Sequence, residues 1–236
     1  MSTLFRILNE CASTNDDAKK WAAQGAPHGA WVLAHRQTAG RGRLGRAWQS
    51  LDGNLFLSVV LRVEPFPGLT WLPLLSAVAA VEALEHEAPA VKLQIKWPND
   101  IWSSTAKMGG ILCESSAGVA VVGLGVNLSR VPISKDLSYA ASALAEFTGK
   151  THRPEELAPK LAQRIVRHLE VLIRSGPEAV RQSYELRARL RTGSRVQWNS
   201  GASSGRVVAL GGAGQLRVQT DAGEIELFAE DVSLSS

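Results

Sequence analysis

Apolar residues recur along this chain with two different periods, which separate helical segments from strands. Spacings of three and four predict helices over residues 13–25, 70–87, 154–172 and 177–190. Ser13 and Thr70 stand where helix caps are expected, and Asp16 follows Ser13 at the spacing of a capping box. Alternation or short apolar runs predict strands over residues 31–34, 55–63, 91–97, 108–115 and 119–128. The pattern predicts an α+β fold with a mixed, mostly antiparallel sheet backed by helices.

The last 45 residues or so change in character. Short strand-like pieces at 194–198, 205–209, 215–220 and 224–229 are separated by glycine-rich turns. Such pieces are typical of a small β-barrel. We therefore expect a main domain over residues 1–190 and a small barrel over residues 191–236.

Composition indicates an ordinary folded protein, because 45% of the 236 residues are hydrophobic and only 20% are charged. No uncharged apolar stretch reaches the roughly 18–20 residues of a membrane span, and the N-terminus lacks the layout of a signal peptide. We expect a cytoplasmic protein that does not bind membranes. Cys11 and Cys113 are the only cysteines, too few for a disulfide framework or a zinc site.

Positive charge is concentrated in one part of the chain although the net charge is only +4. Residues 18–51 hold six lysines and arginines and no acid. Such a segment attracts phosphate groups, whether they belong to a nucleotide or to a nucleic acid. Composition alone does not decide between a nucleotide and a nucleic acid as the partner.

The centre of this basic segment is the run GRGRLGRAW at residues 40–48. Glycines let the backbone approach a ligand closely, and guanidinium groups bind phosphate oxygens in pairs. Taken alone, a glycine-arginine run is more often flexible or RNA-binding than a nucleotide clamp. Its place between two predicted strands, with Trp48 at its end, favours a phosphate-binding loop.

Two further clusters lie at predicted strand ends. KWPND at residues 96–100 leaves one strand, and KMGGILCE at residues 107–114 enters the next. Because only six residues separate them, they form two sides of a hairpin and bring Asn99, Asp100 and Lys107 within reach of one another. This grouping of charge is typical of a site.

These three motifs, in this order and spacing, closely resemble those of biotin protein ligases. The Ser13-Thr14-Asn15 segment and GLGVN at residues 123–127 extend the match over residues 11–127. The resemblance implies a catalytic domain like that of class II synthetases, followed by an SH3-like barrel. It also implies a two-step reaction, in which ATP activates biotin as biotinyl-5′-AMP and a lysine ε-amine then takes the biotinyl group.

The resemblance also assigns roles to individual residues. It implies catalytic roles for Lys107, Arg43 and Asp100. The implied biotin-binding residues are Ser13, Thr14, Asn15, Gln37, Gly40, Arg41, Gly42, Arg43, Lys107 and Gly110. The implied nucleotide-binding residues are Arg41, Arg43, Trp48, Asn99, Lys107 and Asn127. Mg²⁺ is expected with ATP, but no residue is assigned as its ligand, and Glu114 is no more than a candidate. Leu44 departs from the family, which often has a basic residue there.

The implied partner is a biotin carboxyl carrier protein, a subunit of acetyl-CoA carboxylase or a related enzyme. Only twelve residues precede Ser13, too few for the DNA-binding domain of family members that are also repressors, so we expect no DNA binding. The oligomeric state stays open, a homodimer included. Two alternatives remain: a lipoate or octanoate ligase, which shares the acyl chemistry, and an RNA-binding module that uses residues 36–46 as a basic arm.

Overall fold

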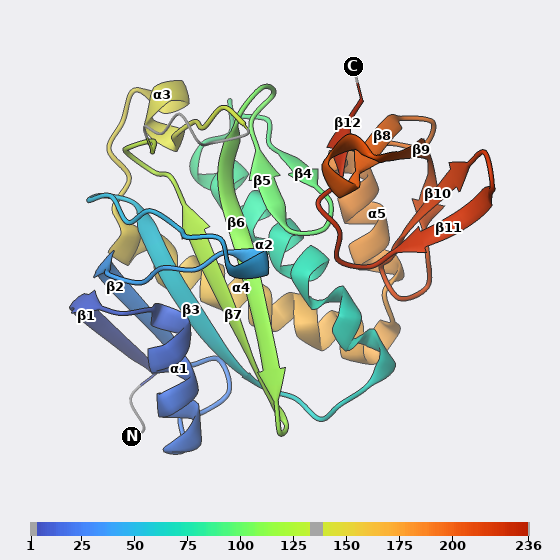
Figure 1. Cartoon of the computed structure of the whole chain (residues 1–236). Helices are drawn as coiled ribbons and strands as arrows, with labels where there is room; N and C mark the ends of the chain where they lie inside the picture. The colour runs from blue at the N-terminus through green and yellow to red at the C-terminus, as the bar shows by residue number, and fades with distance from the viewer. Residues whose placement is uncertain (1–3, 133–138, 236) are drawn as a thin grey trace.

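The computed structural model describes residues 4–132 and 139–235, and its largest element is one seven-stranded sheet. The strand order is β1-β2-β3-β7-β6-β5-β4 (Figure 1). β1 and β2 are parallel and the other neighbouring pairs are antiparallel, which confirms the mixed, mostly antiparallel sheet. The strands are β1 (Phe5–Cys11), β2 (Trp31–Gln37), β3 (Leu55–Arg62), β4 (Gln94–Lys96), β5 (Asp100–Trp102), β6 (Lys107–Ser116) and β7 (Val119–Val126).

Helices cover both faces of this sheet. α2 and α4 pack together on one face, with α5 beside them, while α1 covers β2, β3 and β7 on the other (Figure 1). Leu57 of β3 belongs to the large core and Val60 of β3 to the cluster around α1, which explains the unbroken apolar run there. The helices are α1 (Thr14–Ala23), α2 (Leu72–Glu87), α3 (Leu144–Thr148), α4 (Pro154–Ser175) and α5 (Glu178–Arg187).

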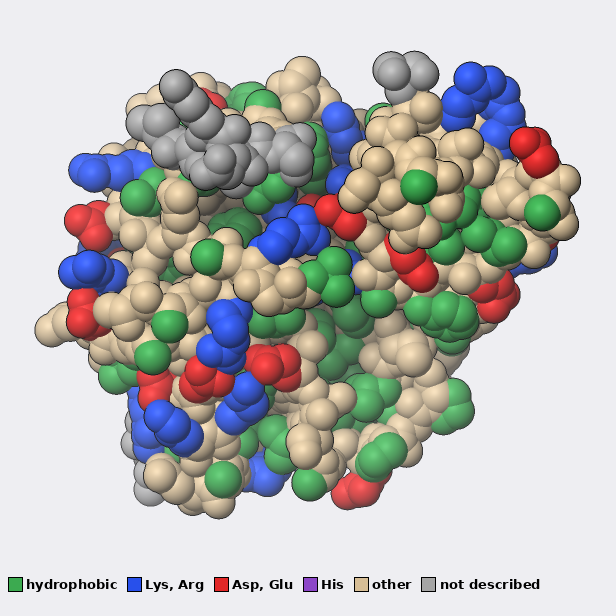
Figure 2. Space-filling view, in the orientation of Figure 1, with side chains coloured by type: hydrophobic (Ala, Val, Ile, Leu, Met, Phe, Trp, Pro, Cys, Tyr) green, Lys and Arg blue, Asp and Glu red, His purple; other side chains and the backbone are tan. Residues whose placement is uncertain are grey.

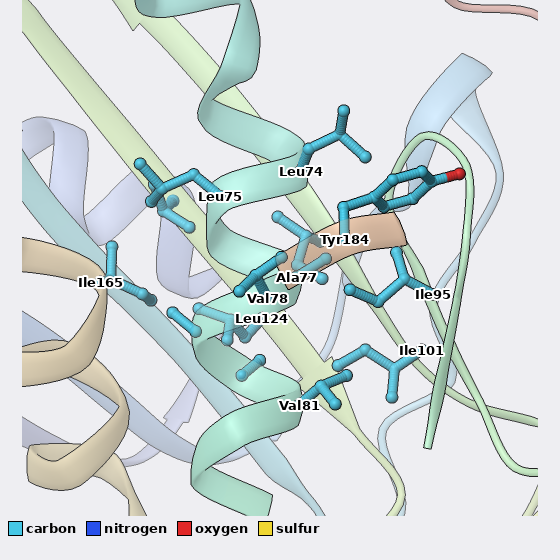
Figure 3. Packing of buried hydrophobic residues seen from close by; sticks show 14 of the residues in the cluster. Leu74, Leu75, Ala77, Val78, Val81, Ile95, Ile101, Leu124, Ile165 and Tyr184 are labelled. Carbon is cyan, nitrogen blue, oxygen red and sulfur yellow. The ribbon is translucent and has the colours of Figure 1, made fainter. Parts of the chain in front are cut away.

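α2 lies at the centre of the core, where its leucines and valines meet side chains of the sheet and of α4 and α5 (Figure 3). By length and composition the segment Pro67–Glu87 could also cross a membrane, but most of it is buried inside the protein. Eleven residues of α2 are buried, which is the burial expected of a helix covered by elements on several sides.

The cap position predicted at Ser13 is confirmed, whereas the cap predicted at Thr70 is wrong. Ser13 holds the cap position of α1, but its side chain makes no capping hydrogen bond, and Asp16 binds Arg41 instead of closing a capping box. α2 begins at Leu72, after a 3₁₀ turn over Pro67–Trp71, and Thr70 Oγ1 donates to the carbonyl of Pro67. In both places a tertiary or turn contact takes the side chain that the local pattern assigned to the cap.

Two strands of the large sheet were not predicted, and one predicted strand is shorter than expected. β1 was missed because it is an edge strand whose side chains are mostly exposed and carry no clear alternation. β5 was missed because only three residues follow the turn after Pro98. The strand predicted over 91–97 is limited to Gln94–Lys96, although the predicted alternation of buried residues holds along it.

The C-terminal strands form a second, five-stranded antiparallel sheet in the order β11-β10-β9-β8-β12, which fits the expected SH3-like domain. Trp71 Nε1 donates to Gly212 O at 2.8 Å, and Trp97 Nε1 donates to Gly214 O at 2.9 Å. The small sheet therefore completes the core of the large one. Its strands are β8 (Arg195–Trp198), β9 (Ser203–Leu210), β10 (Leu216–Thr220), β11 (Gly223–Leu227) and β12 (Ser233–Leu234).

Candidate active site

A cavity opens beneath the loop 40–48, between α1, the hairpins of β4 to β7 and Asp231 of the C-terminal part. The loop crosses in front of β6 and β7 (Figure 1), and Lys and Arg side chains alternate with Asp and Glu across the middle of this face (Figure 2). Most of the predicted site residues line the cavity: Ser13, Thr14, Asn15, Gln37, Arg41, Gly42, Arg43, Trp48, Asn99, Asp100, Lys107 and Gly110. The motifs that are far apart in sequence therefore meet in one place.

One end of the cavity is neutral, and its central group is the amide of Asn15. Asn15 Nδ2 donates to Glu114 Oε2 at 2.6 Å and to Leu112 O at 3.3 Å. The hydroxyl of Ser58, which is fully buried, donates to Asn15 Oδ1 at 2.6 Å. Both hydrogens of Nδ2 are thus used, while Oδ1 keeps a lone pair for a ligand donor.

Gln37 is oriented in the opposite sense. Its Oε1 accepts from the backbone N of Thr14 at 2.8 Å and from Thr14 Oγ1 at 3.1 Å. Its Nε2 finds no acceptor among the described residues, so it is available to donate. Asn15 and Gln37 therefore offer one acceptor and one donor, which suits a ligand that carries both an N–H and a carbonyl group.

Two glycines of β7 make room for this arrangement. A Cβ at Gly123 would overlap Asn15 Oδ1, and a Cβ at Gly125 would lie 2.5 Å from the ring of Trp48. The GLGVN motif thus permits a close approach of Asn15 and Trp48 to β7. Trp48 Nε1 is buried and has no hydrogen-bond partner within 4–132 and 139–235. An unpaired buried donor on a cavity wall indicates that a ligand can supply the acceptor.

The other end of the cavity is charged. Lys107 Nζ lies 2.8 Å from Asp100 Oδ1, and both side chains are largely buried. The ammonium also lies 5.8 Å from the ring centre of Trp48 and 5.0 Å from that of Tyr139. The predicted meeting of Asp100 and Lys107 is confirmed, because β5 and β6 pair as neighbouring strands.

Arg43 reaches over this end from the loop. Its Nη1 donates to Asn99 Oδ1 at 2.8 Å, and its Nη2 donates to the carbonyl of Ala229 in the small domain. Burial lowers the pKa of Arg43, and the carboxylate of Asp100 opposes that shift. A guanidinium remains charged at neutral pH despite such a shift, so Arg43 brings a permanent positive charge to the cavity.

The other two arginines of the loop are bound to carboxylates. Arg41 binds both oxygens of Asp16 at 2.7 Å, a bidentate pair in which the Arg41 hydrogen bonds lower the pKa of Asp16 to about 2. Arg46 lies 3.0 Å from Asp231, which also pairs with Lys96 at 3.5 Å. Arg41 lines the cavity as predicted, but its guanidinium is engaged with α1 rather than free for an anion.

Two predicted residues do not reach the cavity. Asn127 is buried, its Nδ2 donates to Ser142 O at 3.3 Å, and its Oδ1 accepts from Asn54 Nδ2 at 3.4 Å. Its amide therefore holds the chain after β7. Gly40 lies at the base of the loop, where its carbonyl accepts from Trp48 N and a Cβ would lie 2.7 Å from Trp48 O.

Three residues of the site were missed in the sequence. Ser58 orients Asn15, Tyr139 lies over Lys107, and Asp231 holds Arg46 and Lys96. None of them belongs to a motif, and each lies at least 32 residues from the group it contacts. No local signal could have found them.

No three His, Cys, Asp or Glu side chains converge as a metal site within the described ranges. Glu114, considered as a magnesium ligand, has its oxygens occupied by Asn15 and Lys19. It is therefore part of the protein's own hydrogen-bond network.

Comparison with known proteins agrees with the fold. Residues 9–129 match the Biotin/lipoate A/B protein ligase family, and the chain belongs to this family. It is 30% identical to the bifunctional ligase/repressor BirA of Bacillus subtilis, over 94% of this chain and 71% of that protein. It is 36% identical to the biotin--[acetyl-CoA-carboxylase] ligase of Paracoccus denitrificans, over 77% and 80% of the two chains.

A solved structure is also similar over nearly its whole length. The biotin protein ligase of Aquifex aeolicus in complex with biotin and ATP superposes with a TM-score of 0.86 at 30% identity. The match covers 98% of this chain and 99% of that one. Both the large sheet and the small C-terminal sheet therefore belong to the shared fold.

Proposed function

We propose that this protein is an ATP-dependent biotin protein ligase, which activates biotin as biotinyl-5′-AMP and transfers it to a lysine of a biotin carboxyl carrier protein. The observation that carries the proposal is a single cavity with two unlike ends. Asn15 and Gln37 offer an acceptor and a donor that suit the ureido ring. Arg43 and Lys107 offer positive charge that suits a carboxylate and phosphates. The names of the relatives support the same reaction.

In the first step, an oxygen of the biotin carboxylate attacks the α-phosphorus of ATP, and pyrophosphate leaves. Both reactants are anions, so the step needs positive charge that offsets their repulsion and stabilises the charge of the transition state. Arg43 of the loop and Lys107 of β6 supply this charge. The indole of Trp48, beside Lys107, covers the cavity and helps exclude water from the anhydride.

In the second step, the ε-amine nitrogen of the acceptor lysine attacks the acyl carbon. The new amide bond forms as the bond between the acyl carbon and the phosphate oxygen breaks, and AMP leaves. The amine must lose a proton, and Asp100 is the carboxylate placed at this end to accept it. Lys107, 2.8 Å from Asp100, orients that carboxylate and stays close to the departing phosphate.

Mg²⁺ is expected to arrive with ATP, held by phosphate oxygens and water. Since no cluster of metal-ligating side chains exists within the described ranges, we assign it no protein ligand and no step. We further propose that residues 191–236 form a separate functional domain that closes the site. Contacts of Asp231 and Ala229 with the arginine loop support this role.

A transfer assay tests the proposal directly. Purified protein, ATP, Mg²⁺ and an apo carrier domain should give a carrier one biotinyl group heavier when biotin is added. Lipoate in place of biotin should release no pyrophosphate, because lipoate lacks the N–H and carbonyl groups that Asn15 and Gln37 suit. Turnover with lipoate and not biotin would establish the alternative ligase. Salt-sensitive RNA affinity without ATP turnover would establish the RNA-binding alternative.

A cytoplasmic location and the absence of binding to DNA or membranes stay predictions. The oligomeric state is undecided between a monomer and an oligomer such as a homodimer. Specific binding of this chain to a biotin-operon promoter fragment at physiological salt would refute the prediction that it does not bind DNA. Light scattering of the purified chain, with and without biotin and ATP, measures the oligomeric state.

A further inference from the structure

Glu114 of β6 has both carboxylate oxygens occupied by side chains of α1. Oε2 accepts from Asn15 Nδ2 at 2.6 Å, and Oε1 pairs with Lys19 Nζ at 2.9 Å. Asn15 and Lys19 are four residues apart, so they lie one above the other on the same face of the helix. One carboxylate therefore holds a full turn of α1 against β6.

This contact decides which way the amide of Asn15 points. An ionised carboxylate only accepts hydrogen bonds, so it requires the NH₂ group of Asn15 to face β6. The carbonyl of Leu112 takes the second hydrogen of the same group. If the amide were reversed, Asn15 Oδ1 would face two acceptors and lose both hydrogen bonds. The observed orientation leaves Oδ1 toward Ser58 and toward Gly123 of β7, and both Asn15 and Gly123 line the cavity.

The charge of Glu114 is maintained by its partners. Burial acts to raise the pKa of Glu114, but the hydrogen bonds from Lys19 and Asn15 outweigh burial, and the pKa is lowered. Lys19 also lies 3.1 Å from Asp16, which in turn binds Arg41 of the loop. The carboxylate of Glu114 thus stays ionised and remains an acceptor.

We propose that Glu114 is a specificity-determining positioning residue, which fixes Asn15 with its oxygen toward the cavity so that the site selects ligands with an N–H group there. The inference rests on the proposed function, in which this N–H belongs to the ureido ring of biotin. Glu114 itself touches no substrate and acts through Asn15.

Isothermal titration of biotin into the wild type and Glu114→Gln tests the inference. A glutamine amide can donate as well as accept, so it no longer requires one orientation of Asn15. We expect biotin affinity to fall about tenfold or more. At saturating biotin, the rate of pyrophosphate release should stay within about twofold, because the charged end of the cavity is unchanged. Glu114→Asp keeps the acceptor and should bind biotin more tightly than Glu114→Gln.

Glu87→Gln is the matched control. Glu87 pairs with Lys160 at 2.8 Å, and its side chain is 32% exposed, the same as that of Glu114. It lies on α2, away from the cavity lining, so its loss should leave biotin affinity unchanged. A comparable loss of affinity in Glu87→Gln would assign the effect to general stability and overturn the inference.

A double variant separates positioning from any direct effect of charge. If Glu114 acts through Asn15, then Glu114→Gln should weaken biotin binding no further in an Asn15→Ala background. A full additional tenfold loss, or unchanged binding in the single Glu114→Gln variant, would overturn the inference while the wild type still binds biotin. A wild type that binds no biotin would instead remove the proposed function.

Discussion

The two ends of the cavity are held in opposite ways. At the neutral end, Asn15 and Ser58 are buried and belong to α1 and β3, and the amide of Asn15 is fixed by three hydrogen bonds. At the charged end, Arg43 and Arg46 come from a loop and are bound by acceptors of other segments. The neutral end is thus built into α1 and β3, whereas the charged end combines Lys107 of β6 and Asp100 of β5 with arginines that a loop supplies.

This difference follows from the chemistry of the two ends. A neutral ring offers weak hydrogen bonds, so its site gains most when donors and acceptors are already oriented, because little entropy is then lost on binding. A phosphate is attracted by any nearby positive charge, so a loop can supply that charge and still move during the reaction. Asn99 Oδ1, Ala229 O and a carboxylate oxygen of Asp231 accept hydrogen bonds from Arg43 and Arg46 of this loop.

The largest expected effect comes from a substitution that impairs the function of the charged end alone. Lys107→Ala should slow the formation of the adenylate by roughly 10²–10³-fold, the typical cost of losing one preorganised electrostatic stabiliser. Binding of biotin should change much less, because the ureido contacts lie at the other end. Pyrophosphate release and calorimetry measure the two effects, with the exposed residue Lys92→Ala as control. Near-normal pyrophosphate release would show that the reaction centre lies elsewhere.

A second substitution should disturb the hydrogen-bonding groups of the neutral end alone. In Gly123→Ala the added methyl group overlaps Asn15 Oδ1, so α1 or β7 must shift, and such overpacking costs about 1–3 kcal/mol. We expect biotin affinity to fall by roughly 10–100-fold. Gly212→Ala is the control, since nothing lies within 4 Å of a Cβ there. If Gly123→Ala weakened ATP binding as much as biotin binding, the two ends would not be separate.

The sequence predicted the parts of this site that lie within motifs. Lys107 and Asp100 were expected to meet because their segments are sequential and join as a hairpin, and strand pairing brings them to 2.8 Å. The core helices and most strands followed from hydrophobic periodicity, which depends on local spacing. The exposed edge strand β1 and the three-residue β5 carry too little of that signal.

Long-range partners could not be predicted in the same way. The tie between Arg41 and Asp16 spans 25 residues, and the tie between Arg46 and Asp231 spans 185. Each depends on how α1 and the small sheet dock, which no local pattern encodes. The contacts of the Asn127 amide with Asn54 and Ser142 are of the same long-range kind.

Hydrogen exchange should sharpen the contrast between the two ends. The loop is rich in glycine, and exposed ion pairs such as Arg46–Asp231 contribute only about 0.2–1 kcal/mol each. Without ligands, we expect amides of residues 40–48 to exchange quickly, and biotin with ATP should protect them. Amides of α1 should change little. Equal protection of the loop with and without ligands would contradict the assignment of motion to the charged end.

The smallest effect concerns Asp16, which follows Asn15 on α1. Its carboxylate binds Arg41, so it links the helix of the neutral end to the loop that carries Arg43. Hydrogen bonds from Arg41 lower its pKa from 3.8 to about 2 in the folded protein. The carboxylate therefore adds stability that is fully present above about pH 4 and is lost as the pH falls toward 2. Because the pair is partly exposed, we expect about 1 kcal/mol.

Urea unfolding of the wild type and Asp16→Asn, at several pH values between 6 and 2, measures this contribution. The free energies of unfolding should differ by about 1 kcal/mol at pH 6 and converge near pH 2. Asp221→Asn, a substitution in the turn between β10 and β11, is the control and should show no such convergence. A difference that persists unchanged at pH 2 would mean that Asp16 stabilises the protein through packing. Its bond to Arg41 would then carry no charge-dependent link between the helix and the loop.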